Sequence, residues 1–207
     1  MSSADYRFLT HWRVLGTVAE VSNVLEDPKE LSRWWPAVYL KVEELSPGDE
    51  RGVGRAVRVL TKGWLPYTIR WQFRVVESRR PLGFTIEADG DFVGRGVWSF
   101  EQAGAWVDVT FDWRIRFTKA GAARLSPILS PVFAANHRWA MRKGEQSLGL
   151  ELERRRARAS GRPLPAASPP PATTTSPVPL LVAGVAACFA VLVLVRLATR
   201  GRRSDSR

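Results

Sequence analysis

The chain has 207 residues, a net charge of +11 and a single cysteine. That length fits one domain with a core of its own plus an appendage, rather than two full domains. From Glu151 onward ten arginines face three acidic residues, a net of +7, so the first 150 residues carry only +4. The charge distribution therefore predicts no nucleic-acid partner, and Cys188 alone cannot form a disulfide or a cysteine-based zinc site within the chain.

The first predicted elements are an extended segment and two short helices. Residues 1–10 lack the apolar core of a secretory signal, so we expect the folded part to be cytoplasmic. An extended segment is expected at Tyr6–Val14. Short helices follow at Val18–Leu25 and Pro28–Trp35, and Asp27 is placed to cap the second, which has proline at its first position.

Apolar and polar residues alternate between Val53 and Phe117, as is typical of half-buried antiparallel strands. The three clearest apolar runs are Tyr67, Ile69, Trp71, Phe73 and Val75, then Phe92, Gly94, Gly96, Trp98 and Phe100, and finally Val107, Val109, Phe111, Trp113, Ile115 and Phe117. Turn sequences at 46–49, 80–83 and 89–91 separate such runs. The segment therefore predicts an antiparallel meander of five or six strands.

A long helix is predicted after the sheet, from Pro131 to Arg156. Apolar and small residues recur there at steps of three and four, including Phe133, His137 and Met141. We expect this face to lie against the sheet.

The chain changes character beyond residue 158. Residues 159–177 are rich in Pro, Ala, Ser and Thr and bury too little apolar surface to order, which predicts a disordered linker. Residues 178–198 begin with the uncharged run VPLLVAGVAACFAVLVLV, close to the ~20 residues of a transmembrane helix, and 199–207 form a basic tail. The missing signal favours a cytoplasmic domain, whereas the arginines after the run favour a cytoplasmic tail. We give the first rule more weight, because the second requires export of the whole domain, and we expect a single-pass membrane protein.

Several short motifs occur along this order of elements. They are Trp34-Trp35-Pro36, Pro47-Gly48, Gly52-Val53-Gly54 and the run NHRWAMRKGE at residues 136–145. Together with the element order they resemble the START-like (SRPBCC) superfamily, especially its polyketide cyclase/dehydrase branch, over about residues 5–156. The resemblance implies an α+β helix-grip fold for residues 1–158, in which a curved antiparallel sheet wraps around a long C-terminal helix and leaves a deep apolar cavity. Members of the superfamily bind hydrophobic molecules such as lipids, polyketides and quinones, and some catalyse cyclisation or dehydration.

Aromatic side chains are the main candidates for ligand contacts. All nine tryptophans lie in the first 139 residues. We predict that the cavity is lined by Trp35, Trp64, Tyr67, Trp71, Trp98, Trp113, Phe133, His137 and Met141. The alternative is that these side chains simply pack a solid core, because alternation shows which face is buried and not whether that face encloses a void.

Catalytic chemistry has one weak candidate, His137, whose ordinary pKa suits acid–base work. A histidine without a partner at fixed spacing is more often structural. The sequence has no HExxH-type spacing, phosphate loop or nucleophile motif, so we predict neither metal nor cofactor.

The leading functional hypothesis is a membrane-anchored protein that binds a hydrophobic small molecule. Its partners would be that molecule and the lipid bilayer. The first alternative is a polyketide cyclase or dehydratase that uses the same cavity, and the second is a protein-interaction module whose own side chains fill the cavity.

Overall fold

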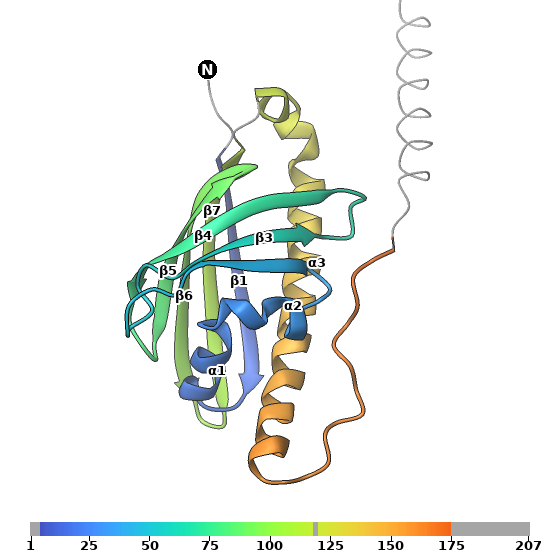
Figure 1. Cartoon of the computed structure of the whole chain (residues 1–207). Helices are drawn as coiled ribbons and strands as arrows, with labels where there is room; N and C mark the ends of the chain where they lie inside the picture. The colour runs from blue at the N-terminus through green and yellow to red at the C-terminus, as the bar shows by residue number, and fades with distance from the viewer. Residues whose placement is uncertain (1–4, 118–119, 175–207) are drawn as a thin grey trace, which may run out of the picture. The chain divides into compact units, whose positions relative to one another are not determined.

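Seven antiparallel strands form one sheet in the computed structural model of the chain, which describes residues 5–117 and 120–174. The strands are β1 (Asp5–Leu15), β2 (Tyr39–Ser46), β3 (Ala56–Lys62), β4 (Thr68–Ser78), β5 (Gly83–Gly90), β6 (Phe92–Ala103) and β7 (Trp106–Phe117). In space their order is β1-β7-β6-β5-β4-β3-β2, so β2 to β7 form a meander. Figure 1 shows that the sheet is strongly curved. The predicted meander is confirmed.

The N-terminal segment is a strand of this sheet, and the sheet is therefore larger than the sequence predicted. β1 pairs with β7 along its whole length, from Asp5 opposite Arg116 to Leu15 opposite Trp106. The extended segment predicted at Tyr6–Val14 is therefore a strand, whose partner could not be assigned from the sequence because it lies about a hundred residues away. Local patterns carry no information about pairing over that distance.

Two short helices connect β1 to β2. α1 (Val18–Leu25) begins with a capping box, in which the Thr17 side chain accepts a hydrogen bond from Glu20 N and the Glu20 side chain accepts one from Thr17 N. The second predicted helix is a 3₁₀ turn, η1 (Pro28–Glu30), followed by α2 (Leu31–Trp34). Asp27 lies at the N-cap position and Pro28 at the first position of η1, as predicted, but the Asp27 side chain makes no capping hydrogen bond.

The long helix α3 (Ala120–Ala159) lies across the open side of the curved sheet (Figure 1). The sequence placed its start at Pro131, because a proline inside a helix removes a hydrogen bond and is costly. The helix nevertheless begins earlier and passes through this proline. Met141, Leu148 and Leu152 belong to the core that α3 shares with the sheet, so the predicted packing of the helix face is confirmed.

α3 ends in a turn that reverses the direction of the chain. Gly161 has a φ of +64°, its N–H donates to Arg158 O, and Arg162 N donates to Ala157 O. This pair of bonds is a Schellman motif, which suits glycine because the left-handed conformation costs it little.

Residues 162–173, which we name the strap, follow the helix without forming a helix or strand. Figure 1 shows the strap running back beside α3. Arg154 Nη2 donates to Ala167 O (2.7 Å), and at the far end of the strap Lys62 Nζ donates to Thr173 O (2.8 Å). The compact unit of the chain extends to Thr173. The composition gave no indication of these contacts, and the boundary at residue 158 stays a prediction.

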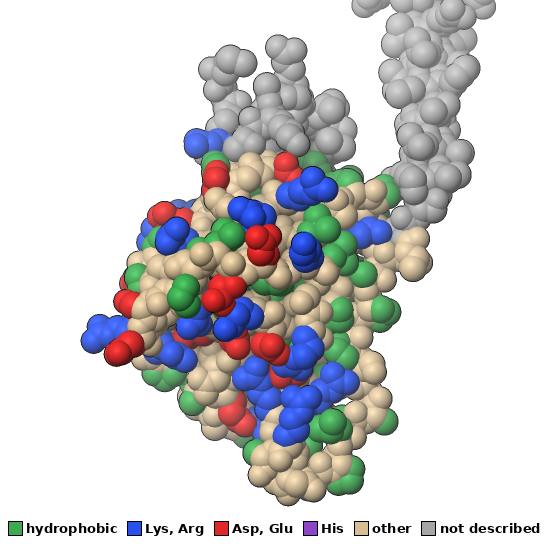
Figure 2. Space-filling view, viewed as in Figure 1, with side chains coloured by type: hydrophobic (Ala, Val, Ile, Leu, Met, Phe, Trp, Pro, Cys, Tyr) green, Lys and Arg blue, Asp and Glu red, His purple; other side chains and the backbone are tan. Residues whose placement is uncertain are grey.

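No helix in residues 5–117 and 120–174 is long and apolar enough to cross a membrane. The predicted membrane helix, 178–198, and the basic tail, 199–207, lie outside the described residues. On the face shown in Figure 2, acidic and basic side chains are interspersed, and basic side chains gather toward the C-terminal end of α3.

Candidate functional site

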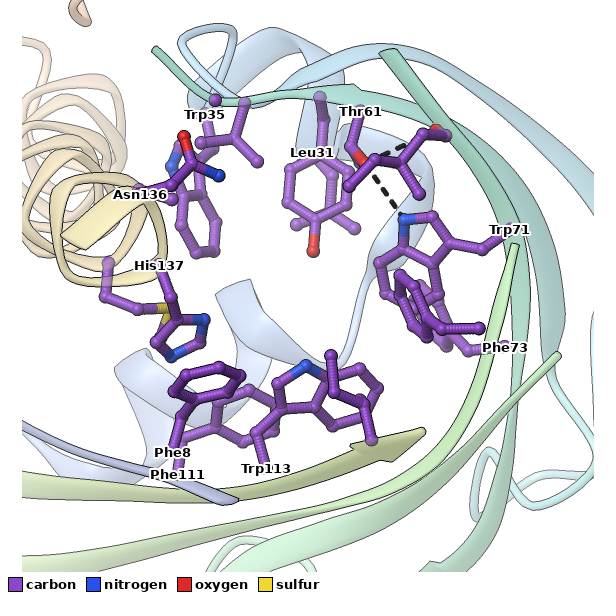
Figure 3. Close-up of a pocket in the computed structure, with 18 of the residues that line it drawn as sticks. Phe8, Leu31, Trp35, Thr61, Trp71, Phe73, Phe111, Trp113, Asn136 and His137 are labelled. Carbon is purple, nitrogen blue, oxygen red and sulfur yellow. Dashed lines mark hydrogen bonds between the residues drawn. The ribbon is translucent and has the colours of Figure 1, made fainter. Parts of the chain in front are cut away.

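A cavity of about 170 Å³ lies between the sheet and α3. Figure 3 shows aromatic side chains surrounding it, with His137 and Asn136 on the helix side and Trp71 and Phe73 on the sheet side. The lining is mainly apolar and contains, besides the predicted residues, Phe8, Leu25, Leu31, Val38, Tyr39, Thr61, Lys62, Gly63, Ile69, Phe73, Phe84, Ile86, Phe92, Phe111, Ile115, Asn136 and Ala140.

The structure brings together all but one of the side chains predicted to bind ligand. Trp35, Tyr67, Trp71, Trp98, Trp113, Phe133, His137 and Met141 line the cavity. Trp64 is not part of the lining, and its backbone N–H instead donates to Asn136 Oδ1 (3.0 Å). Trp64 lies in the loop between β3 and β4, outside the alternating apolar runs of the sequence.

A stack of aromatic rings forms the sheet side of the cavity. Trp98 of β6 lies opposite Phe111 of β7, and their ring centroids are 4.0 Å apart at an interplanar angle of 15°. Phe111 in turn stacks on Trp113, at 5.4 Å. Gly96 makes this possible, because a Cβ at that position would lie 2.7 Å from atoms of both Phe111 and Trp113. The glycine in the alternating pattern of β6 therefore leaves space for the rings of its neighbours.

Several polar side chains of the lining are paired within the protein. Trp71 Nε1 donates to Thr61 Oγ1 (3.0 Å), as the dashed line in Figure 3 marks, and Thr61 Oγ1 donates to Ile69 O (3.4 Å). Burial raises the pKa of the Tyr39 hydroxyl, which therefore stays protonated at neutral pH. Among the described residues, the buried Trp35 Nε1 has no hydrogen-bond partner. Aromatic surface thus dominates the cavity, with a few neutral polar groups.

His137 lies on the cavity face of α3, as predicted. Its ring stacks on Phe8 at 4.4 Å between centroids, and its Nε2 is 3.3 Å from Thr10 Oγ1. Burial, with a smaller contribution from the Arg138 charge, lowers the pKa of His137 to about 4. The imidazole is therefore neutral at pH 7. Within the described part of the chain, no carboxylate hydrogen-bonds to it, as an acid–base pair would require.

The lowered pKa of His137 predicts a specific loss of stability in acid. The unfolded chain takes up the proton near pH 6.5, whereas the folded chain resists it down to about pH 4. The contribution is therefore complete above pH 6.5 and is lost as the pH falls toward 4. We expect His137→Gln to flatten the free energy of unfolding over this range, as measured by urea denaturation at a series of pH values.

Glu20 supplies an internal control for that measurement. A hydrogen bond from Arg156, opposed by burial and aided by Thr17, lowers the pKa of Glu20 from 4.5 to about 2. Its stabilisation is present above pH 4.5 and is lost as the pH falls through 2, a range that His137→Gln leaves unchanged. An unaltered slope between pH 6.5 and 4 in the variant would contradict the assignment to His137.

No group of three or more His, Cys, Asp or Glu side chains suited to a metal ion occurs in the described residues. The absence of metal and cofactor stays a prediction.

Comparisons with known proteins agree with this geometry. A family described as polyketide cyclase / dehydrase and lipid transport matches residues 13–153. The chain is similar to the solved structure of Zhui aromatase/cyclase from a Streptomyces species, with 18% identity, a TM-score of 0.60, and 77% of this chain and 100% of that chain covered. It is also similar to norcoclaurine synthase from Thalictrum flavum, with 14% identity, a TM-score of 0.52, and 72% and 86% of the two chains covered. At these identities the likeness shows the helix-grip fold. A search of curated proteins found no match.

Proposed function

Because the chain belongs to the polyketide cyclase/dehydrase and lipid transport family, we propose that it binds an uncharged, apolar small molecule in the cavity beneath α3. The observation that supports this most directly is the lining itself, an aromatic enclosure with few polar groups, some of them paired within the protein. Such a surface gains free energy from apolar ligands and orients them through a small number of hydrogen bonds.

Binding without chemistry is the simpler form of this function. None of the described lining residues is Asp or Glu, and His137 is neutral with a threonine as its hydrogen-bond neighbour. Proton transfer during cyclisation or dehydration usually relies on a positioned acid and base of matched pKa. The second candidate is a cyclase or dehydratase, which is favoured by the position of His137 in the cavity and by the Zhui aromatase/cyclase likeness.

The second part of the proposed function is attachment to a membrane through residues 178–198. The support comes from the sequence, which has 18 uncharged residues from Val178 to Val195 followed by arginines. An anchor would keep the cavity close to molecules dissolved in the bilayer and so raise their effective concentration.

Ala140→Trp tests the binding site. Ala140 lines the cavity from α3, so an indole there would occupy ligand space. We expect loss of the co-purified apolar ligand in native mass spectrometry, at a stability cost near the lower end of the ~1–3 kcal/mol typical of overpacking. The control is Ala159→Trp at the exposed end of the same helix, which should retain the ligand.

Ligand retained equally by the parent and by Ala140→Trp would overturn the assignment of the cavity as the site. Recovery of a chemically altered ligand after incubation would favour the enzyme over the carrier.

A further inference from the structure

The cavity opens to solvent beside the loop between β3 and β4. We name residues 63–67, with the sequence GWLPY, the mouth loop. Tyr67 both lines the cavity and is 42% exposed, so it marks where the cavity meets the surface. Tryptophan, tyrosine and a neighbouring lysine, Lys62, are the side chains that favour the interface between water and lipid.

The mouth loop is held from two sides. From α3, Asn136 Oδ1 accepts a hydrogen bond from Trp64 N (3.0 Å) and lies so close to Gly63 that a Cβ there would be 2.0 Å from it. From the strap, Thr173 Oγ1 donates to Gly63 O (2.9 Å), and Lys62 Nζ donates to Thr173 O (2.8 Å). The last residue of the strap is therefore attached to two residues that line the cavity.

The length of the strap matches this attachment. From Asn136, which holds the mouth loop, to Ala159, α3 rises about 35 Å at ~1.5 Å per residue. The strap from Arg162 to Thr173 contains prolines at 163, 165 and 169–171, and spans about 34 Å at the ~3.1 Å per residue of polyproline. After the turn at Gly161, the strap is thus long enough to return from the end of α3 to the mouth loop.

The path of the strap limits how far from the mouth loop the predicted anchor can begin. Five residue steps separate Thr173 from Val178, so the apolar run begins within about 18 Å of the mouth loop. Without the strap contacts, the 19 residue steps from Ala159 to Val178 would let the apolar run begin up to about 68 Å from Ala159. Ala159 lies at the end of α3 that is opposite the mouth loop.

We propose, building on the proposed ligand binding and membrane anchor, that the mouth loop and the end of the strap form a lipid-facing surface. A phospholipid bilayer is its partner, and the apolar ligand passes between bilayer and cavity at this surface. The strap determines how the domain is oriented on the bilayer, because its contacts hold the chain beside the mouth loop just before the anchor begins. Without these contacts the anchor would be connected to the domain only at the far end of α3.

Two labels at opposite ends of one strand test this orientation. Thr68 begins β4 beside the mouth loop, and Leu82 lies in the turn beyond its other end, both exposed. The full-length chain with Cys188→Ser carries a fluorophore at Thr68→Cys or at Leu82→Cys. It is reconstituted into vesicles of phosphatidylcholine and phosphatidylglycerol that contain doxyl-labelled lipid. We expect the lipid spin label to quench the fluorophore at position 68 and not at position 82.

Releasing the strap should abolish that difference. The release variant combines Pro169→Ser, Pro170→Gly, Pro171→Ser and Thr173→Val, whereas Thr174→Val is the matched control that leaves the hydrogen bonds of Thr173 intact. Urea denaturation checks that the release variant remains folded. Equal quenching at both positions with the strap intact, or an unchanged difference after its release, would overturn the inference.

Val185→Arg separates this inference from the anchor itself. It places a charge within the apolar run and should remove the chain from vesicles, giving the baseline without quenching. If the parent chain does not associate with vesicles, the anchor is wrong and this orientation falls with it. If the parent associates and its labels are quenched equally, the anchor stands and only the role of the strap is wrong.

Discussion

Gly144→Ala is expected to destabilise the protein by about 1–3 kcal/mol, although alanine normally favours a helix. A Cβ at position 144 would lie 2.3 Å from Trp35 Cζ2. Trp35 cannot easily move away, because it is 3% exposed and packs against Trp12, Trp34 and Tyr39. Since Trp35 also lines the cavity, the clash should disturb the ligand site along with the core.

Gly149→Ala is the matched control, in the same helix with the opposite expected sign. A Cβ there has no neighbour within 4 Å, so the substitution adds helix propensity without strain and should stabilise by about 0.5–1 kcal/mol. Urea denaturation of both variants measures the two changes in the free energy of unfolding. Equal effects from the two substitutions would contradict the close contact of α3 with Trp35.

Arg33→Met is the second substitution with a large expected effect. Glu151 is 1% exposed, and Arg33 binds it through two hydrogen bonds, of 2.9 and 2.7 Å, while Arg155 adds a third of 2.8 Å. Burial raises the pKa of Glu151, but these hydrogen bonds lower it by more, so the carboxylate stays charged. Removing Arg33 leaves that buried charge with one partner and should cost about 3 kcal/mol, near the lower end for a broken buried pair.

Arg58→Met provides the comparison, because Arg58 pairs with Glu43 at 3.2 Å with both side chains about half exposed. Removing an exposed pair should change the free energy of unfolding by less than about 1 kcal/mol. Similar losses in the two variants would contradict the importance of burial at Glu151. The same geometry ties α2 to α3, so the Arg33 variant should also loosen the helices that hold Trp35.

Strand alternation was the sequence signal that predicted most of the fold. It located β4, β6 and β7 and put Trp71, Trp98 and Trp113 on the face that lines the cavity. It was not used for β5, although Phe84, Ile86 and Ala88 alternate there with Thr85, Glu87 and Asp89. The two cavity residues of this strand, Phe84 and Ile86, were therefore missed.

Other features were missed for different reasons. The capping box of α1 is visible in the sequence as Thr17 followed three residues later by Glu20, which is a recognisable signal for the start of a helix. Phe8 was missed because β1 finds its partner only through long-range pairing. The strap could not be predicted from composition, since the hydrogen bonds at Ala167 and at Thr173 O use backbone carbonyls, which every residue possesses.

The Schellman turn at Gly161 also determines where the protein can be divided. The core that contains Leu148 and Leu152 ends within α3, so we expect a fragment ending at Arg158 to retain its apolar packing. Such a fragment nevertheless lacks Thr173 and leaves the Gly63 carbonyl and the Lys62 ammonium to solvent. The shortest fragment with a full core and the shortest with a full cavity entrance thus have different C-termini. Fragments for binding assays should therefore extend through Thr173.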